Sequence, residues 1–330
     1  MKNNTTVILK GSEVASLLPL DACILAVENA FRLYSAGMVA PPSIMGIHVE
    51  NGGYHIKAGV MGTEKSYFVA KTNANFPKNP KKYNLPTIQG VVTVYDTDNG
   101  RLLALMDSIE VTIIRTGAAT AVAAKYLAKK NARVATIVGC GSQGKISIKM
   151  LMEVRPIEKV FIYDIDLHAA NKLIEELGYL HISIVRTDDL KAALAESDIC
   201  VTCTTSKTPL LYHDDIRPGT FIAAVGSDNE DKQELSAKVL SLNTLITDVT
   251  NQCAKIGELH HAIEAKLMTE KDTYAELGEI ILGKKKGRKS DSEIIIFDST
   301  GMGLQDVAAA SIVYEKAVAN SIGLKVEFGN

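Results

Sequence analysis

The feature that most constrains the fold is a glycine-rich turn between a strand-like and a helix-like segment. Residues 133–138 form an apolar, β-branched run, and the next six, Gly139 to Gly144, have the spacing G-x-G-x-x-G before the helical stretch 143–154. In such a turn the first glycine allows the sharp bend, the second lets a phosphate approach the backbone, and the third lets the helix pack on the strand. The free N–H groups at the helix start favour an anion. The turn therefore predicts a βαβ unit that binds a pyrophosphate.

An acidic residue stands where a dinucleotide site requires one. Asp164 ends the next strand-like run, 159–163, and lies 20 residues after Gly144. A carboxylate there accepts hydrogen bonds from the ribose hydroxyls of NAD and repels the 2′-phosphate of NADP. We therefore expect NAD as the cofactor. The expected cofactor contacts in this segment are Gly139, Gly141, Ser142, Gln143, Gly144 and Asp164.

A nucleotide-triphosphate loop is an alternative interpretation of the same turn. Residues 139–145 also fit G-x-x-x-x-G-K, but that motif needs Ser or Thr next to hold magnesium, and Ile146 stands there. A purely structural glycine turn is the other alternative. The strand, the helix and Asp164 together favour dinucleotide binding over both.

Strand-like and helical segments alternate from residue 132 onward. The expected strands are 133–138, 159–163, 181–185, 199–202, 220–225, 244–248 and 293–297. Such alternation produces a parallel sheet with helices on both faces. We therefore expect an α/β fold whose dinucleotide-binding part, residues 126–302, is a Rossmann-type, doubly wound parallel sheet.

The first 125 residues have a mixed pattern. Ser12 is expected to cap a helix over 13–18, and longer helices are expected over 22–37 and 116–128. The expected strands are 54–60, 66–72, 89–95 and 101–106, the last two as a hairpin. With the terminal helix 303–319, these segments predict a mixed α+β domain formed by residues 1–125 and 303–330.

Charge and composition exclude several classes of function. The 330 residues carry 36 Lys and Arg against 38 Asp and Glu, so the net charge of −2 gives no footprint for nucleic acid or an anionic membrane. No stretch reaches the ~18 apolar residues of a membrane span, and the N-terminus has no signal-peptide core. We expect a cytoplasmic protein without nucleic-acid or membrane partners. The one basic cluster, residues 284–289, is expected to be a solvated loop, because a nucleic-acid patch would need basic support elsewhere.

The cysteines indicate neither disulfides nor a metal site. Five cysteines are a small and odd number, which argues against a disulfide framework. Cys200 and Cys203 have the C-x-x-C spacing, but they lie in a strand-like segment and no second pair completes a zinc site. We expect buried thiols and no metal.

Several further segments narrow the function. In chain order they are AKTN at 70–73, 108–119 with RTGAA, AVGSD at 224–228, IGE at 256–258 and FDSTG at 297–301. This set resembles the ornithine cyclodeaminase/μ-crystallin family over essentially the whole chain. The resemblance implies a homodimer with a Rossmann-type NAD(P) domain and a second domain for dimerisation and substrate contacts. It also implies chemistry at the α-carbon of amino acids or their imines.

The resemblance implies roles for individual side chains. Arg115 matches the arginine that binds the substrate carboxylate, and a bidentate guanidinium suits that task. Lys71 matches a pocket lysine that contacts substrate and can polarise its nitrogen, and Asp228 matches the aspartate that moves a proton. The alternatives are a salt bridge for Arg115, an exposed strand lysine for Lys71 and a helix cap for Asp228. Thr300 is expected to contact substrate, Thr116, Val225 and Ser227 to contact the cofactor, and Glu258 and His260-His261 are weaker candidates.

Two positions depart from the family pattern. Ser43 stands where many members carry an arginine, and Lys57 stands about where ornithine cyclodeaminases carry a glutamate. A glutamate can recognise a cationic side-chain amine, whereas Lys57 would repel one. At ~4 Å and an effective dielectric constant of ~20, a unit charge pair is worth ~4 kcal/mol, which is enough to reverse a preference. Lys57 is therefore expected to bind substrate and to favour anionic or neutral imino acids.

Three functions remain open from the sequence. The favoured one is an NAD-dependent oxidoreductase that transfers hydride at the α-carbon, either an imino-acid reductase or an amino-acid dehydrogenase. The second is an ornithine cyclodeaminase, a lyase that releases ammonia and regenerates NAD. The third is a non-catalytic, μ-crystallin-like NAD(P)-binding protein, which the joint presence of Lys71, Arg115 and Asp228 disfavours.

The acidic residue at position 164 predicts the choice of cofactor. NAD(H) should be used with a higher kcat/KM than NADP(H), because the Asp164 carboxylate faces the extra phosphate as a like charge and residues 165–171 contain no arginine to relieve it. The measurement is kcat/KM with both cofactors. A kcat/KM with NADP(H) that equals or exceeds the value with NAD(H) would contradict this prediction.

Overall fold

The computed structural model describes residues 5–62 and 65–328, and the chain forms two compact units. Unit 1 comprises residues 1–115 and 302–330, and unit 2 comprises residues 116–301. The division after Arg115 falls inside helix α4 (Ser108–Leu127), whereas the sequence predicts a boundary at residue 125 of the same helix.

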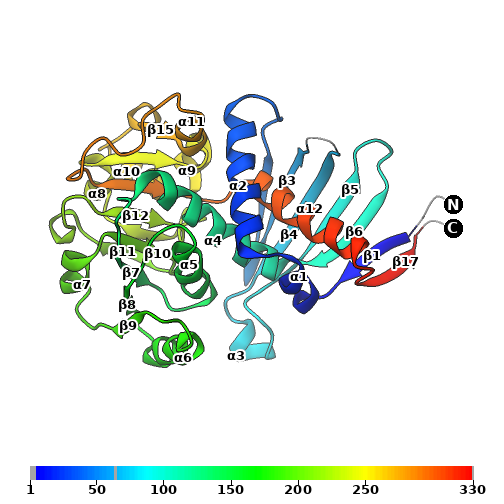
Figure 1. The fold of residues 1–330 in the computed structure, drawn as a ribbon, viewed down its shortest axis with the longest axis horizontal. Helices are drawn as coiled ribbons and strands as arrows, with labels where there is room; N and C mark the ends of the chain where they lie inside the picture. The colour runs from blue at the N-terminus through cyan, green and yellow to red at the C-terminus, as the bar shows by residue number, and fades with distance from the viewer. Residues whose placement is uncertain (1–4, 63–64, 329–330) are drawn as a thin grey trace. The chain divides into compact units, whose positions relative to one another are not determined.

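Unit 1 is built on a seven-stranded mixed sheet with the order β17-β1-β6-β5-β4-β3-β2 (Figure 1). β1 pairs in parallel with β6, and every other neighbouring pair is antiparallel. The strands are β1 (Thr5–Leu9), β2 (Ser43–Val49), β3 (Gly52–Met61), β4 (Tyr67–Asn75), β5 (Ile88–Asp96), β6 (Leu102–Asp107) and β17 (Leu324–Glu327). The helices are α1 (Gly11–Leu17), α2 (Leu20–Ser35), α3 (Asn79–Tyr83) and α12 (Gly303–Ala319).

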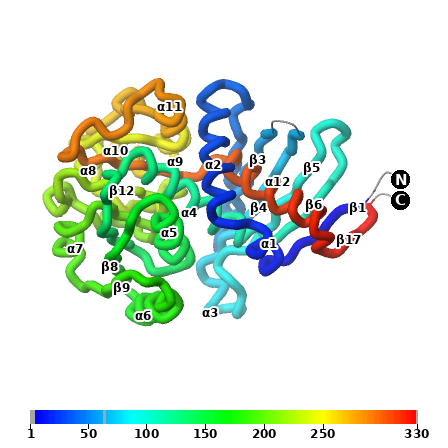
Figure 2. The backbone as a smooth tube through the Cα atoms, viewed as in Figure 1, coloured from blue at the N-terminus to red at the C-terminus, as the bar shows by residue number. Residues whose placement is uncertain are grey.

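The C-terminal helix α12 packs on this sheet and against α2 (Figure 2). Two glycines permit the close approach. A Cβ on Gly59 of β3 would lie 2.9 Å from Leu304 Cδ2, and a Cβ on Gly303 would lie 2.9 Å from the carbonyl oxygen of Ala58. The first turn of α12 is thereby held against β3, so the last part of the chain completes the core of the first part.

Unit 2 is built on an eight-stranded, all-parallel sheet with the order β15-β14-β16-β12-β10-β7-β8-β9. The strands are β7 (Val134–Val138), β8 (Lys159–Tyr163), β9 (Ser183–Arg186), β10 (Ile199–Thr202), β12 (Phe221–Ala224), β14 (Thr244–Thr247), β15 (Ala275–Glu276) and β16 (Ile295–Asp298). β11 (Lys207–Leu211) and β13 (Gln233–Leu235) form a separate pair. The helices after α4 are α5 (Ser142–Met152), α6 (Leu167–Leu177), α7 (Leu190–Glu196), α8 (Ala237–Ser241), α9 (Thr250–Ile256), α10 (Glu258–Glu264) and α11 (Leu277–Ile281).

The strand order fixes where a ligand is expected in this sheet. From β7 the chain first adds β8 and β9 on one side, and then returns to add β10 and β12 on the other. The point between β7 and β10 is therefore the topological switch point, and ligands of open α/β sheets bind beside it at the carboxyl ends of the strands. The turn that begins at Gly139 lies there, directly after β7.

The predicted fold class is confirmed, and most predicted elements are present within a few residues of their expected bounds. The predicted cap at Ser12 is wrong, because α1 begins at Gly11 with Lys10 as its N-cap. Helix α4 begins eight residues before the expected position 116, because the Asp107 carboxylate accepts a hydrogen bond from the N–H of Ile109, 2.8 Å away, and stabilises the earlier start. Strand β2 was not predicted, since all seven of its residues are exposed and carry no clear alternation.

Among the described residues, no single helix is long and apolar enough to cross a membrane, and α1 with α2 meets the criteria of length and composition only as a pair bent by 82°.

Candidate active site

In unit 2 the glycine turn has the backbone that its spacing predicts. Gly139 has a φ of 106°, which L side chains rarely adopt, and a Cβ there would lie 2.9 Å from the carbonyl oxygen of Cys203. A Cβ on Gly144 would lie 2.1 Å from the carbonyl oxygen of Gly139, so the third glycine lets α5 pack on the turn. A Cβ on Gly141 would meet nothing within 4 Å. The second glycine therefore faces open space, where a phosphate can approach the backbone.

The start of helix α5 leaves hydrogen-bonding groups for a ligand. Gly141 is its N-cap and supplies no side-chain cap, so Ser142, Gln143 and Gly144 present N–H groups of the first turn at the positive end of the helix. The side-chain oxygen of Gln143 is buried and has no hydrogen-bond partner in the described residues. These groups fit a pyrophosphate and its attached ribose.

Asp164 is joined to this turn by hydrogen bonds. Its Oδ2 accepts from the N–H of Cys140 at 2.7 Å, and its Oδ1 accepts from the N–H of Asp166 at 2.9 Å. Each carboxylate oxygen has a second lone pair, so both remain able to accept from ribose hydroxyls. The carboxylate is thus oriented by the same turn that faces the phosphate.

A buried carboxylate that the sequence analysis did not identify joins two loops at the carboxyl edge of the sheet. Glu234, at the middle of β13, accepts from the N–H of Thr204 at 2.5 Å and from the N–H of Gly226 at 3.0 Å. These residues follow β10 and β12. Burial raises the pKa of the Glu234 carboxyl, and the two N–H groups oppose that rise. Glu258 in turn accepts from the N–H groups of Glu234 and Leu235 at 2.7 and 3.1 Å.

Asp228 lies in the loop after β12, at the strand end where the sequence analysis expected it. Its side chain is 50% exposed and accepts a hydrogen bond from Lys232 Nζ at 2.6 Å. The loop is closed by Ser227, whose Oγ donates to the carbonyl oxygen of Lys232 at 2.6 Å, while His261 Nε2 lies 2.7 Å from the same oxygen. Val225 continues the backbone pairing of β12 through its N–H bond to Thr202 at 2.9 Å.

The other predicted contacts in unit 2 have less distinctive settings. Thr300 is buried, accepts from Gln252 at 2.7 Å and donates to Asp248 at 3.4 Å. Thr116 is half-buried on α4, where its carbonyl oxygen accepts from Thr120. On α10, His260, His261 and exposed Glu264 bring three ligand-type atoms within 4.8 Å of one another. The absence of a metal from the reaction stays a prediction.

Unit 1 contains a buried cluster of charges centred on Asp306 in the first turns of α12. Its Oδ1 accepts from Lys71 Nζ of β4 at 2.7 Å and from Arg115 Nε of α4 at 3.0 Å. Arg115 Nη1 donates to Gln305 Oε1 at 2.9 Å. These four side chains are buried. The sequence predicts roles for Lys71 and Arg115 but not for Gln305 and Asp306, because nothing in the local sequence of α12 marks these two residues as buried.

Some hydrogen-bond donors and acceptors of the cluster have no partner in the described part of the chain. Within the described residues, no protein group accepts from Arg115 Nη2, and Asp306 Oδ2 and Gln305 Nε2 are buried without partners. One carboxylate between a guanidinium and an ammonium also leaves one positive charge in excess when Lys71 is protonated. Such a site favours an anion, because buried charge is stable only when it is paired.

Burial sets the protonation of the cluster. It lowers the pKa of Lys71 from 10.5 to about 7, with Arg115 acting in the same direction and Asp306 opposing it. Burial alone would raise the pKa of Asp306, but Lys71 and Arg115 outweigh it and hold that pKa below its usual value. Near neutral pH the lysine is thus able to give or take a proton beside a fixed carboxylate.

Lys57 faces this cluster. It is 8% exposed, and β3 pairs with β4 so that Lys57 stands directly opposite Lys71. Directly opposite residues of neighbouring strands point to the same face of a sheet. Two like charges in this position repel, and the charge of Lys57 also lowers the pKa of Lys71.

Comparison with known proteins gives this arrangement a context. The sequence profile described as the ornithine cyclodeaminase/mu-crystallin family matches residues 4–321. An archaeal alanine dehydrogenase dimer with bound NAD has a similar structure, with a TM-score of 0.93, 37% identity and coverage of 98% of this chain and 100% of that one. The Δ1-pyrroline-2-carboxylate reductase of Thermococcus litoralis, in complex with NADH and L-proline, has a TM-score of 0.91 and 32% identity, with coverage of 97% of this chain and 100% of that one. The iminosuccinate reductase of Paracoccus denitrificans, in complex with NAD+, has a TM-score of 0.88 and 32% identity, with coverage of 98% of this chain and 100% of that one.

The buried lysine predicts a pH dependence of stability. Between pH of about 7 and 10.5 the unfolded chain binds a proton at Lys71 that the folded chain does not, so this residue makes the free energy of unfolding rise with pH across that window. Replacing Lys71 with Met should remove that part of the rise. The measurement is urea unfolding of both proteins at several pH values.

A matched control is Lys145→Met, which removes a partly exposed lysine paired with Glu176. It should leave the pH dependence close to that of the unsubstituted chain. If Lys71→Met and the unsubstituted chain gave the same pH slope, the lowered pKa would be wrong.

Proposed function

Because the chain belongs to the ornithine cyclodeaminase/mu-crystallin family, we propose that it is an NAD-dependent oxidoreductase acting at the α-carbon of an amino acid or its imine. The reaction is imino-acid reduction or its reverse, amino-acid dehydrogenation. Relatives at 32–37% identity over nearly the whole chain are an alanine dehydrogenase and two imino-acid reductases. The observation that carries the proposal is the buried Lys71–Asp306–Arg115 cluster, which suits a substrate that pairs a carboxylate with a nitrogen.

Arg115 is the proposed carboxylate-binding group. Its Nε and Nη1 are held by Asp306 and Gln305, so the guanidinium plane is fixed and Nη2 remains as a donor. A fixed, always-charged guanidinium recognises a carboxylate with little loss of side-chain entropy. The named substrates of the three relatives all carry a carboxylate next to the carbon that bears nitrogen.

The residues of the glycine turn fit NAD. Gly141 leaves room for the pyrophosphate, the N–H groups of Ser142, Gln143 and Gly144 face it, and Asp164 accepts from the adenosine ribose. Thr116, Val225 and Ser227 are the further proposed contacts. When bound, NAD supplies the hydride acceptor or donor that the reaction requires.

Two residues are proposed for proton transfer. Lys71, with a pKa of about 7, donates a proton to the substrate nitrogen during reduction and takes one up during oxidation. Asp228 is the second candidate, held by its ion pair with Lys232. Thr300 stays a proposed substrate contact.

The substrate side chain is proposed to be anionic or neutral. Lys57 and Lys71 stand opposite each other on neighbouring strands, so this face of the sheet already carries two cations. A cationic side chain, such as that of ornithine, would add a third like charge. This argues against the cyclodeaminase reaction with ornithine.

A homodimer is proposed from the other face of the sheet in unit 1. The residues that alternate with Lys57 and Lys71 point away from α12, and many of them are large, apolar and exposed. They include Met45, Ile47, Tyr54, Val60, Phe68 and Val91. An open apolar sheet face of this kind suits a second copy of the chain, and an alanine dehydrogenase relative is a dimer. We also propose that the protein is located in the cytoplasm.

The test is a panel of amino acids with NAD and imino acids with NADH, with ammonia measured in parallel. We expect net oxidation or reduction of the cofactor with alanine-, proline- or aspartate-type substrates, and a drop in kcat of ~10²–10⁴-fold in Asp228→Asn with NADH binding retained. Ammonia release from ornithine without net change in NADH would identify a cyclodeaminase. No turnover with any substrate despite NADH binding would support the non-catalytic alternative.

The charge at position 57 predicts substrate preference. Lys57→Glu should lower kcat/KM for aspartate-type substrates and raise it for ornithine relative to alanine, because the charge facing the cluster is reversed. The matched control is Lys82→Glu on α3, an exposed lysine of the same unit that carries the same change of charge. Efficient turnover of ornithine by the unsubstituted chain would defeat the charge argument.

A further inference from the structure

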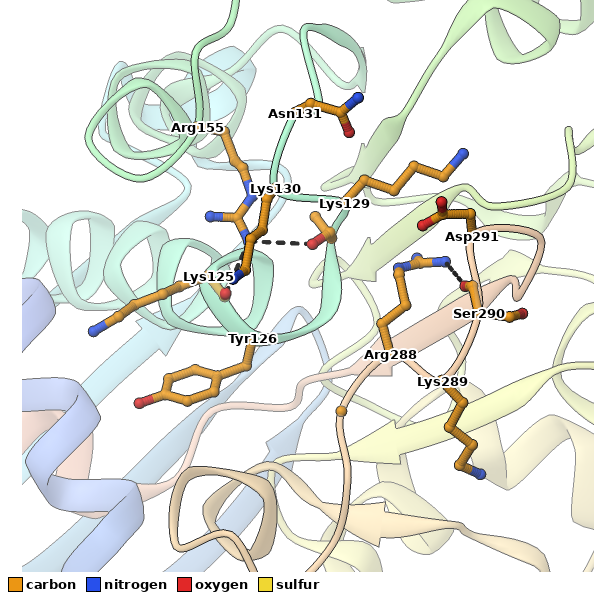
Figure 3. A pocket seen from close by; sticks show the side chains of 12 residues that line it. Lys125, Tyr126, Lys129, Lys130, Asn131, Arg155, Arg288, Lys289, Ser290 and Asp291 are labelled. Carbon is orange, nitrogen blue, oxygen red and sulfur yellow. Dashed lines mark hydrogen bonds between the residues drawn. The ribbon is translucent and has the colours of Figure 1, made fainter.

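Two basic segments that are distant in the sequence meet at a hollow in unit 2. One is the C-terminal end of α4 with the residues that follow it, 125–131, and the other is the loop 287–291, which overlaps the basic cluster 284–289. Arg155 joins them from the segment after α5 (Figure 3). The hollow has a volume of about 480 Å³, which is in the range of small-molecule sites. We propose that it binds a small oligophosphate, at a site separate from the dinucleotide turn.

The lining of the hollow is strongly cationic. Six of the residues around it are basic, namely Lys125, Lys129, Lys130, Arg155, Arg288 and Lys289, and Asp291 is the single acidic one. In the described part of the chain, no ion pair joins Lys129, Lys130, Arg155, Arg288 or Lys289 to a carboxylate.

Several other lysines on the surface of the same unit are paired with carboxylates. Lys145 pairs with Glu176, Lys159 with Glu196, and Lys207 with Asp231, at 2.8 to 2.9 Å. The chain as a whole has more carboxylates than cations. The hollow therefore gathers several cations that have no ion-pair partner among the described residues, and a multivalent anion is the ligand that would compensate them.

The two arginines bind the C-terminal end of α4. Arg155, 9% exposed, donates through Nη2 to the carbonyl oxygens of Ala124, Lys125 and Ala128 at 2.7 to 3.2 Å, and Arg288 donates through Nε to that of Leu127 at 2.8 Å. These bonds satisfy the carbonyl groups at the end of α4. The lysines around them are therefore not needed to cap the helix.

The same arginines retain unused donors. Arg155 Nε and Arg288 Nη2 are buried and have no hydrogen-bond partner in the described residues. Figure 3 shows the two side chains reaching the hollow from different segments. Buried donors without acceptors are costly, so an anion that accepts from them gains affinity.

The shape of the site favours a small oligophosphate over a nucleic acid. The cations surround a hollow instead of lining an extended face, and the chain has a net charge of −2. A long polyanion gains affinity from contacts with many phosphates along a basic surface. A chain of two or three phosphates places several charges within one hollow.

Inorganic tripolyphosphate is the probe, measured by isothermal titration calorimetry on the full chain saturated with NADH, so that the dinucleotide turn is occupied. The test variant is Lys129→Gln with Lys130→Gln, and the matched control is Lys284→Gln with Lys286→Gln. The control removes the same charge from the same basic region at residues that do not line the hollow. We expect one tripolyphosphate per chain, binding weakened at least about tenfold in the test variant and less than about twofold in the control.

Three results would overturn the proposal. Equal weakening in the two variants would reduce the effect to diffuse attraction. Tripolyphosphate binding that is measured without NADH but is absent from the NADH-saturated chain would place the phosphate in the dinucleotide turn. A single-stranded oligonucleotide that binds more tightly than tripolyphosphate, with the same sensitivity to Lys129→Gln and Lys130→Gln, would replace the small ligand by a nucleic acid.

Discussion

One buried carboxylate oxygen organises unit 1. Asp306 Oδ1 accepts from Lys71 and from Arg115, residues that are 235 and 191 positions away in the sequence, and so joins β4, α4 and α12 at a single atom. Removing charges from water costs several kcal/mol per ion unless they are paired and hydrogen-bonded. The three groups therefore depend on one another, and the C-terminal helix has to return to the N-terminal sheet for any of them to be stable there.

The same contact prepares the chemistry proposed for the cluster. Because Asp306 and Gln305 hold one edge of Arg115, the remaining Nη2 is oriented without a ligand. Because Lys71 is buried beside a second cation, its pKa falls to about 7. A polar network that was complete in itself would offer nothing to a substrate, whereas this one retains a donor, an acceptor and a titratable proton.

Unit 2 uses carboxylates for a related purpose. Glu234 joins the loops after β10 and β12, and Asp164 joins the glycine turn to the end of β8. Loops at the carboxyl edge of a parallel sheet leave backbone N–H groups without partners, and a buried carboxylate accepts two of them at once. Glu234 therefore positions its two loops from the protein interior, whereas Asp164 is half-buried and is also proposed to bind the ribose.

The sequence by itself determined the elements whose signal is local. The spacing of Gly139, Gly141 and Gly144 after an apolar run specified a strand, a turn and a helix, because only glycine fits the φ of 106° and the close approach of 2.1 Å. The same pattern also predicted that Asp164, at the end of the next strand, belongs to the dinucleotide site. The parallel sheet of unit 2 was also predictable, since buried strands and amphipathic helices alternate along the chain.

Only the tertiary structure decided which distant residues meet. Asp306 and Glu234 carry no local mark of their role, because a carboxylate in a helix or a short strand is usually exposed, and its burial depends on partners elsewhere in the chain. The face of Lys57 was equally undecided, since a shift of one residue in strand pairing turns a side chain to the other side of the sheet. The hollow between residues 125–131 and 287–291 likewise exists only because the fold brings these two distant segments together. Periodicity and turn chemistry act over a few residues, whereas the charge pairing of Asp306 joins residues 191 and 235 positions apart, and strand register is set by pairing with a neighbouring strand.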